Sequence, residues 1–341
     1  MNLSQSNSTG EQIPVKCVRD TSVTAVVFPI LYSLLFVAAL VLNILAAWIF
    51  FQIPNTSTFV VYLKNVVVAD LLMTVTILIK VVSDSDAGSW QLKAFTCRFS
   101  AVLFYMTMYM SILLLGLISL DRYLKIVRPF GKTCMQKVAF GKAAAIAMWG
   151  VMFFVTALPN MILTDREPAH TTKLKCSSLK GPLGMKWHMV TNHFCQFVFW
   201  GTFTLMAFCY TFISKKVYES YQNSRSKSKA TSQKTKAKVF VVVAVFFVCF
   251  APFHFTRIPY TMSQTGSVDN CRMQQALYIA KETTLWLSAT NTCLDPLIYI
   301  FLCRIFRKKL ADALRLKSKC LPIEDSESTV ETSTKMDTTP L

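Results

Sequence analysis

Charged side chains are scarce in this sequence. Only 16% of its 341 residues are Asp, Glu, Lys or Arg, whereas a soluble domain carries about 25%. Apolar residues make up 53% of the chain, and they lie in continuous blocks rather than in helical stripes. This composition excludes an ordinary soluble domain and indicates a protein embedded in a membrane.

Motifs for catalysis and transport are also lacking. The sequence contains no glycine-rich loop for nucleotide hydrolysis, no cluster of metal ligands and no internal repeat. We therefore predict neither an enzyme nor a transporter, and we expect no cofactor.

Seven apolar blocks are long enough to cross a membrane as helices, which takes about 20 residues. They cover residues 23–51, 59–82, 96–120, 139–163, 188–214, 238–263 and 275–303. In lipid the backbone must satisfy its own hydrogen bonds, so helices are expected. The sequence thus predicts an all-α membrane protein with one seven-transmembrane helix bundle at 23–303. We expect an outer tail at 1–22, a membrane-surface helix at 304–320 and a disordered tail at 321–341.

Acidic residues are half as numerous as basic ones, 18 against 36, which leaves a net charge of +18. The basic residues gather after the third block, between the fifth and sixth, and after the seventh. With seven spans these segments share one side, and the positive-inside rule makes that side cytoplasmic. We predict a multi-pass plasma-membrane protein with an extracellular N-terminus. Nucleic acid is not an expected partner, because the basic residues flank membrane spans.

The first 22 residues are polar and show no cleavable signal, so the first span is expected to act as its own signal. Asn2 and Asn7 each begin an Asn-x-Ser/Thr sequon on this tail, which predicts glycosylation.

Four of the eleven cysteines fall in the predicted outer segments, an even number in an oxidising compartment. Four cysteines allow three pairings. Cys97 opens the third span and Cys176 lies in the loop between spans four and five, so we pair these two. Cys17 then pairs with Cys271. The other seven are interpreted as small core residues.

Two carboxylic acids lie deep in apolar spans, Asp70 in the second and Asp295 in the seventh. Ser111 and Asn291 are placed to share a polar pocket with them. One interpretation is a water-filled hydrogen-bond network. The other is a site for a monovalent cation such as sodium, because buried carboxylates need a counter-charge.

The segment after Cys303 has Phe306, Leu310 and Leu314 on one helical face with cations between them. This pattern predicts a helix on the inner membrane surface, in contact with lipid. Cys320 is a candidate palmitoylation site. The last four residues, Thr338–Leu341, resemble a PDZ ligand with a free carboxylate, and the alternative is a tail that no partner binds.

Several motifs occur together at spacings that resemble those of a rhodopsin-like G-protein-coupled receptor. They are Asn43, Ala69-Asp70-Leu71, Asp121-Arg122-Tyr123, Trp149, Pro252 and Asp295-Pro296-Leu297-Ile298-Tyr299. The resemblance covers about residues 20–315.

A narrower resemblance links the chain to the metabotropic purinergic nucleotide receptors. Residues 246–261 and 281–285 resemble that branch, and residues 179–184 followed by 186–188 are similar to its ADP-recognising members. Three features depart from the usual pattern. The second span has no proline, Phe250 replaces a tryptophan common in the superfamily, and the fifth span has no proline.

The resemblance implies an extracellular nucleotide as ligand, so we predict a binding face from the residues near the outer ends of the spans. Cations with aromatic and amide neighbours suit a phosphate chain and a stacked base. The candidates are Lys80, Tyr105, Tyr109, Lys180, His188, Asn192, Phe253, Arg257, Tyr260, Gln264 and Lys281. Alternative roles are membrane-interface positions for Tyr105 and Tyr109 and a snorkelling side chain for Lys80.

The resemblance also implies a switch at the inner side, formed by Asp121, Arg122 and Tyr123 with Asp295, Pro296 and Tyr299. We expect Arg122 to pair with Asp121 in the resting state. The implied partners are an inhibitory heterotrimeric G protein, arrestin and receptor kinases, and the implied result is lower adenylate cyclase activity.

Other ligands on the same fold remain open at this stage. A UDP-sugar or a lipid phosphate would use the same outer cations. A retinal photoreceptor is excluded, because its Schiff-base lysine would lie about two turns before Pro296, where Ala289 and Asn291 are found.

The charge bias leads to a test of orientation. An epitope inserted at Ser4 should be stained by antibody on intact cells, because the positive-inside rule places that tail outside. Staining that appears only after permeabilisation would refute the orientation.

Overall fold

The computed structural model describes Cys17 and residues 20–85, 89–128, 134–167, 176–223, 229–264 and 270–313. The predicted glycosylation sites Asn2 and Asn7, the lipidation candidate Cys320 and the PDZ motif Thr338–Leu341 lie outside these residues. Leu314 and the tail at 321–341 also lie outside them.

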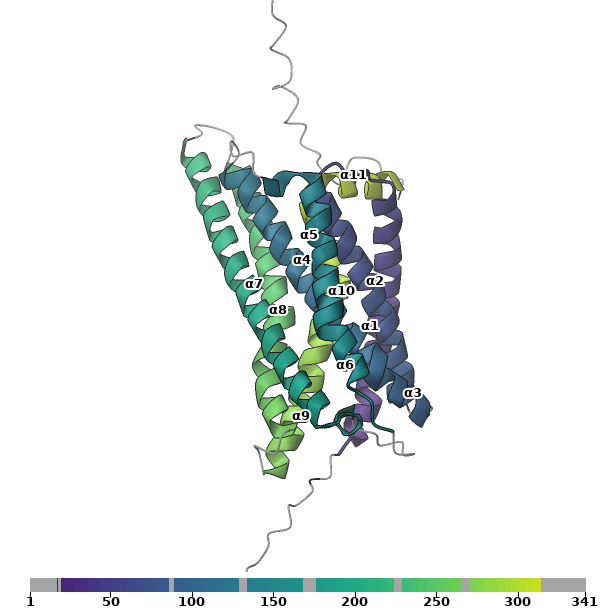
Figure 1. The fold of residues 1–341 in the computed structure, drawn as a ribbon. Coiled ribbons are helices and arrows are strands. Elements are labelled where there is room, and N and C mark those ends of the chain that lie inside the picture. The colour runs from purple at the N-terminus through teal and green to yellow at the C-terminus, as the bar shows by residue number, and fades with distance from the viewer. Residues whose placement is uncertain are drawn as a thin grey trace, which may run out of the picture.

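Long helices run side by side and form one bundle (Figure 1). The first three spans are α1 (Ser22–Phe51), α2 (Thr58–Asp84) and a longer helix composed of α3 (Trp90–Phe95), the π-helical turn η1 (Thr96–Ser100) and α4 (Ala101–Val127). The fourth consists of α5 (Val138–Val151), the π-helical turn η3 (Met152–Ala157) and α6 (Leu158–Ile162). The fifth and sixth are α7 (Pro182–Asn223) and α8 (Lys229–Gln264). The seventh comprises α9 (Cys271–Ala289) and α10 (Asn291–Leu302).

Two 3-10 turns, η2 (Cys134–Gln136) and η4 (Cys176–Leu179), lie between spans. Within the described residues six helices are long and apolar enough to cross a membrane, and Cys271–Ile300 with the bent segment after it brings the number to seven. The predicted all-α seven-helix bundle is therefore confirmed.

Side-chain caps define where several helices begin. Ser57 accepts a hydrogen bond from the Val60 amide at the start of α2, and Ser89 accepts one from Leu92 at the start of α3. Asn270 accepts from the Arg272 and Met273 amides at the start of α9. These bonds satisfy backbone N–H groups that have no partner in the first turn of a helix.

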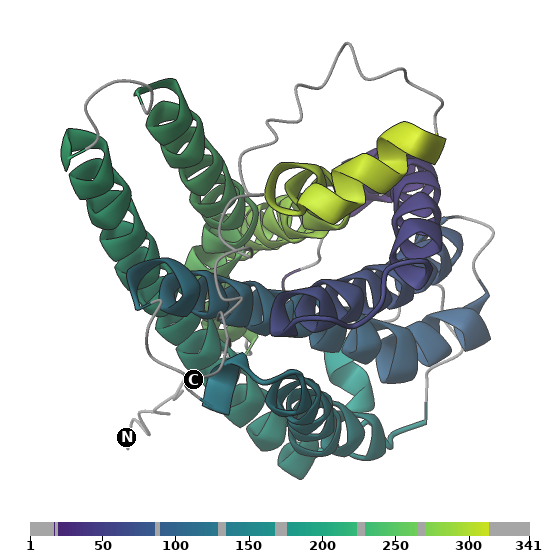
Figure 2. The ribbon, with the colours of Figure 1, turned by 90° about the horizontal axis from the view of Figure 1, so that it is seen from above.

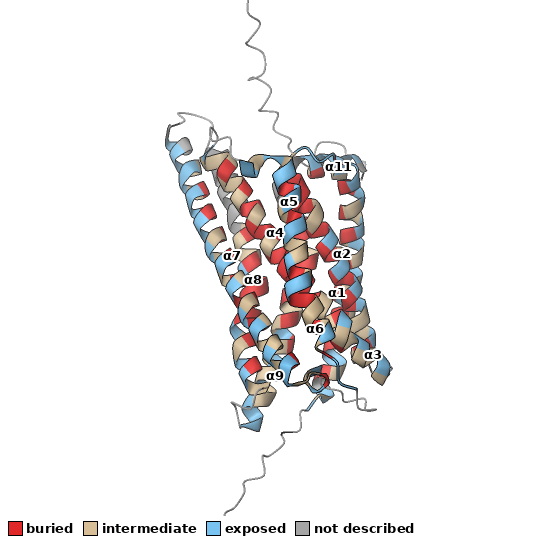
Figure 3. Cartoon of the chain, in the orientation of Figure 1, coloured by how far each residue is buried: buried red, intermediate tan, exposed pale blue. Residues whose placement is uncertain are grey.

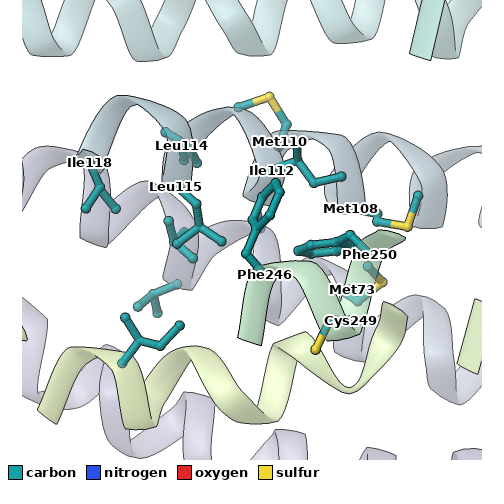
Figure 4. Close-up of a cluster of buried hydrophobic side chains, with 14 of the residues drawn as sticks. Met73, Met108, Met110, Ile112, Leu114, Leu115, Ile118, Phe246, Cys249 and Phe250 are labelled. Atoms are coloured by element: carbon teal, nitrogen blue, oxygen red, sulfur yellow. The ribbon is translucent and has the colours of Figure 1, made fainter. Parts of the chain in front are cut away.

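The centre of the bundle is apolar. Side chains of α4, among them Met108, Ile112 and Leu115, face Phe246 and Phe250 of α8 (Figure 4). Buried residues line the inside of the helices, while exposed residues follow the outer faces of α5 and α7 (Figure 3). Exposed apolar side chains along membrane-length helices are expected, because these helices face lipid rather than water.

Two polar side chains from the sequence motifs connect helices across this core. Asn43 donates to the carbonyl oxygen of Thr292 at 2.9 Å, which joins α1 to α10. The indole N–H of Trp149 donates to Asn65 Oδ1 at 3.1 Å, which joins α5 to α2. Both are hydrogen bonds of the kind that holds membrane helices together.

The short helix expected after the seventh span is present as α11 (Arg304–Ala313). It lies across the end of the bundle, at 93° to the preceding span (Figure 2). The expectation that Phe306 faces the membrane surface is wrong. Its side chain is buried, and its ring packs against Phe50 and Tyr299 with centroids 5.1 and 5.9 Å apart. Phe306 therefore anchors α11 to α1 and α10.

Both disulfides proposed from the sequence are present in the structure. Cys97 in η1 is joined to Cys176 in η4, and Cys17 is joined to Cys271 at the start of α9. We call this end of the bundle the disulfide end and the opposite one the α11 end. The first bridge connects η4 to the beginning of α4, and the second connects Cys17 to α9.

We expect different results from removing the two bridges. Cys97→Ser should strongly reduce the amount of this protein at the cell surface, because the bridge holds the segment before α7 against the beginning of α4, and losing a native disulfide costs about 2–5 kcal/mol. Cys17→Ser should leave the amount of protein at the cell surface unchanged, and it should weaken the binding of the expected ligand. The free, exposed Cys134 provides the control, Cys134→Ser, which should change neither. Non-reducing peptide mapping that joined Cys17 to Cys97 would contradict the pairing.

Candidate functional site

The side chain of Arg257 lies inside the disulfide end of the bundle, with only 6% of the residue exposed. Its Nη2 and Nε atoms donate to Asn192 Oδ1 on α7, at 3.0 and 3.3 Å. Its guanidinium carbon lies 5.0 Å from the centre of the Tyr105 ring and 5.7 Å from that of Phe253. Within the described residues it forms no ion pair with a carboxylate, so only neutral groups hold this buried charge.

Lys180 supplies a second cation without a carboxylate partner among the described residues. Its Nζ donates to Asn160 Oδ1 and Thr164 Oγ1, each at 3.2 Å. Burial and the nearby Arg257 guanidinium lower the pKa of Lys180 to about 8. His188 is within electrostatic range of both cations. We call Arg257, Lys180, His188 and Asn192 the Arg257 cluster.

Lys80 and Lys281 have acidic partners instead. Lys80 Nζ lies 2.6 Å from Asp84 Oδ2 and 3.7 Å from Glu282 Oε2, and Lys281 Nζ lies 2.7 Å from Glu282 Oε1. We call these four residues the Glu282 network. Because α2 has no proline, it continues unbroken to Asp84 and places that carboxylate one turn from Lys80. Lys80 is therefore half-buried and paired, and it does not snorkel.

Aromatic rings separate the Arg257 cluster from the Glu282 network. The rings of Tyr105 and Phe253 stack with their centroids 6.1 Å apart, and Lys281 Nζ lies 5.6 Å from the centre of the Tyr260 ring. Tyr105 interacts electrostatically with both Lys281 and Arg257. The membrane-interface interpretation of Tyr105 and Tyr109 is wrong, because these side chains face the inside of the bundle.

A second row of contacts lies one helical turn deeper. The Tyr109 hydroxyl is 3.0 Å from His254 Nε2, and the His254 ring stacks on Phe199 with centroids 3.7 Å apart. Gln196 Nε2 donates to the carbonyl oxygen of His254 at 2.8 Å. These contacts lie directly beneath the Arg257 cluster and link α4, α7 and α8 at that depth. Gln264, also predicted to bind ligand, donates to the Tyr260 hydroxyl at 3.2 Å.

The structure therefore brings the predicted ligand residues together, but as two electrostatically different groups. Asp84, Glu282 and His254 were absent from the predicted ligand set. For Glu282 a signal existed, since a carboxylate within an apolar span is costly without a partner. Its partner Lys80 is on another helix, so only the fold reveals the pair.

The two deep carboxylic acids are buried and lie close enough to interact electrostatically. The Tyr299 hydroxyl donates to Asp70 Oδ2 at 3.1 Å, and Asn291 Nδ2 donates to Asp295 Oδ2 at 2.7 Å. Asp295 Oδ1 and Asn291 Oδ1 are buried and have no hydrogen-bond partner among the described residues. Ser111 is buried as well. Unpaired oxygen acceptors next to carboxylates form a donor set that fits a small cation.

The predicted pair between Asp121 and Arg122 is not formed. Asp121 instead accepts hydrogen bonds from Thr58 Oγ1 at 2.5 Å and from Lys125 Nζ at 2.8 Å. The Arg122 guanidinium lies 3.5 Å from the centre of the Phe59 ring. Neighbouring residues on a helix point in different directions, whereas residues four apart share a face, so Lys125 is the better partner. The Tyr123 ring packs against Phe208 and Phe212 of α7.

Comparison with known proteins places this arrangement in a family. The sequence profile of the rhodopsin family of 7 transmembrane receptors matches residues 42–299. The chain is 55% identical to purinoceptor 13 of Homo sapiens over 295 residues, which is 86% of this chain and 83% of the relative. It is 50% identical to purinoceptor 13 of Rattus norvegicus over 317 residues, or 93% of each chain.

A further relative is purinoceptor 14 of Bos taurus, 43% identical over 303 residues, 89% of this chain and 90% of the relative. The matched residues 42–299 include Asp70, Asp121-Arg122-Tyr123 and Asp295-Pro296, which carried the resemblance in the sequence. The chain is therefore a multi-pass membrane receptor rather than an enzyme, and it belongs to the purinoceptors within the rhodopsin family of seven-transmembrane receptors.

Proposed function

We propose that this chain is a receptor for an extracellular nucleotide, ADP in particular, and that it switches an inhibitory heterotrimeric G protein which lowers adenylate cyclase activity. The observation that carries the proposal is a pair of cations, the buried Arg257 and the half-buried Lys180, whose hydrogen bonds among the described residues go to neutral oxygens only. A diphosphate would supply the missing negative charge. The relatives' names, which call them purinoceptors, support the same ligand class.

The geometry suggests how the nucleotide is held. Phosphate oxygens would accept hydrogen bonds from Arg257 and Lys180, since a guanidinium fork suits two phosphate oxygens at once. The faces of Tyr105 and Phe253, which already stack at 6.1 Å, are suited to contact the base. Lys281 and Lys80 would exchange part of their pairing with Glu282 for phosphate, which would loosen the link between α2 and α9.

In this proposal the disulfide end faces the extracellular medium and the α11 end faces the cytoplasm. Arg122 stacks on Phe59 and forms no ion pair with a carboxylate among the described residues, so a G protein that reached its guanidinium would not have to break an ion pair. An ADP dose response in cells, measured as inhibition of cyclic AMP formation, tests ligand and coupling together. Loss of the response on treatment with pertussis toxin identifies the inhibitory class. Arrestin, receptor kinases and a PDZ protein remain predicted partners.

A UDP-sugar or a lipid phosphate is the alternative ligand class, because either would satisfy the same cations. A panel of ADP, UDP, UDP-glucose and lysophosphatidic acid, compared by half-maximal concentration, separates these. ADP as the weakest member of the panel would overturn the ADP assignment and leave the receptor assignment intact.

We further propose sodium as an allosteric ligand at Asp70 and Asp295. The unpaired buried oxygens of Asp295 and Asn291 support it. Sodium should weaken agonist binding in the parent and have less effect in Asp295→Asn. Equal sodium effects in both forms would return this pocket to a water-filled hydrogen-bond network.

Arg257→Ala should weaken the ADP response by about 2–5 kcal/mol, because a buried charged contact is lost. Each 1.4 kcal/mol is a factor of ten, so the shift in half-maximal concentration should exceed about 20-fold. Arg257→Lys should recover only part of the loss, since lysine lacks the planar fork. The control is Arg272→Ala, an exposed arginine at the same end. An unchanged response in Arg257→Ala at equal surface expression would discard the assignment.

The pKa of about 8 at Lys180 predicts a pH dependence of binding. Lysine is charged below its pKa, and phosphate binding needs the charged form. ADP affinity should therefore fall as the pH rises from 7 to 9, by up to about tenfold per unit above the pKa. Arginine stays charged over this range, so Lys180→Arg should bind with an affinity that is nearly independent of pH. A parent receptor with constant affinity from pH 7 to 9 would refute the role of Lys180.

A further inference from the structure

A cavity of about 250 Å³ lies on the side of the bundle, away from the polar site. Its walls come from three spans: Ala147, Met148, Val151 and Met152 of the fourth, Phe194 and Val198 of α7, and Leu113 of α4. Every side chain that lines it is apolar. Nothing in the lining could hold a phosphate, an amine or an ordered water molecule.

A π-helical turn of the fourth span lies at the edge of this cavity. The π-helical turn η3 begins at Met152, on the cavity wall, and such turns insert an extra residue that displaces the helix locally. The small side chain of Ala147 lies one turn before Val151 on the same face. Ala147 and Val151 are exposed at the outer surface, whereas Met152 is buried. The cavity therefore opens outward beside Ala147.

The opening faces lipid hydrocarbon. Ala147 to Met152 lie near the middle of the span Val138–Ile162, which places them near the middle of the bilayer. Large side chains that are close in sequence to the lining residues are apolar and strongly exposed: Ile146 at 72%, Phe154 at 64% and Phe197 at 76%. At this depth the surrounding molecules are the terminal parts of lipid acyl chains.

We propose that this cavity binds the end of a membrane lipid's acyl chain. An apolar cavity of about 150 Å³ already stays dry and binds benzene, so this larger space can accept several methylene groups. Each methylene transferred from another hydrocarbon environment gains little hydrophobic energy, so binding depends on dispersion contacts with the cavity walls. A flexible chain can adapt its torsions to such walls, which favours an acyl chain over a rigid sterol ring system.

The cavity shares α7 with the Arg257 cluster, and it shares α4 with Tyr109 in the row of contacts below that cluster. On α7, Phe194 lies between Asn192 and Gln196 in the sequence, and Val198 follows Gln196. Asn192 accepts a hydrogen bond from Arg257, and Gln196 donates one to the His254 carbonyl. Leu113 lies one turn from Tyr109, the partner of His254. A chain packed in the cavity would restrain this part of α7, so we infer that occupancy sets agonist potency. This last step rests on the proposed function, whereas the binding of the chain does not.

Photolabelling of the full-length receptor tests the binding. The receptor is placed in nanodiscs of phosphatidylcholine that include a phosphatidylcholine with a diazirine at the end of one acyl chain. After irradiation, labelled residues are identified by mass spectrometry. We expect label on Leu113 and none on Leu115, its neighbour on the same helix, which is 1% exposed. Equal labelling of the two leucines would overturn the proposal without involving any nucleotide.

A pair of variants locates the entry point. Ala147→Phe should fill the opening and remove the label from Leu113, while Ile146, which faces bulk lipid, keeps its label. The matched control is Ala143→Phe, an exposed alanine one turn away on the same helix and outside the cavity, which should leave both labels unchanged. Persistent labelling of Leu113 in Ala147→Phe would refute this entry. Displacement of the label by a sterol, but not by a phospholipid with unlabelled chains, would refute the acyl chain as occupant.

The same variants test the coupling to the ligand site. Ala147→Phe should shift ADP potency, and Ala143→Phe should not. If the label is lost and the potency is unchanged, the chain binds without regulating the receptor. If the parent does not respond to ADP but Leu113 is labelled in it, the proposed ligand is wrong and the lipid site stands.

Discussion

The buried guanidinium of Arg257 is the constraint on which the disulfide end depends. A charge inside an apolar bundle is costly unless surrounding groups satisfy it. Here Asn192 from α7 accepts two of its N–H bonds, and rings from α4 and α8 lie on its flanks. One side chain therefore sets the relative positions of three spans. The same neutral surroundings leave its charge available for an anion.

Charge is distributed unevenly along the bundle. The disulfide end contains cations without carboxylate partners among the described residues, next to a network in which Glu282 and Asp84 neutralise Lys80 and Lys281. Deeper in the bundle, the carboxylic acids Asp70 and Asp295 form no ion pair with a cationic side chain among the described residues. Along the seventh span Lys281 and Asp295 are separated by roughly 20 Å, at 1.5 Å per residue. An anionic ligand and a small cation would thus suit different depths of one bundle.

Helix α7 connects the environments on its two faces. One face carries Asn192 and Gln196, whose amides bond Arg257 and the His254 carbonyl. The adjacent face carries Phe194 and Val198, which line the apolar cavity. At the α11 end the same helix provides Phe208 and Phe212 for the Tyr123 ring. A small displacement of α7 would therefore reach the polar site, the cavity and the Asp121-Arg122-Tyr123 segment.

The sequence by itself determined the membrane bundle, the helix number and the identity of most polar residues at the site. Long apolar blocks can satisfy their backbone only as helices, and the motifs around Asp121 and Asp295 identify the receptor family. The tertiary structure decided which charges meet. Glu282 is adjacent to Lys281 in sequence, but its contact with Lys80 depends on how α2 packs near α9. Asp121 bonds to Lys125 and Thr58 rather than to Arg122, because the Asp121 and Arg122 side chains point in different directions. The apolar cavity also has no sequence signal, since it lies between the fourth span, α4 and α7, and a gap in packing depends on all three helices together.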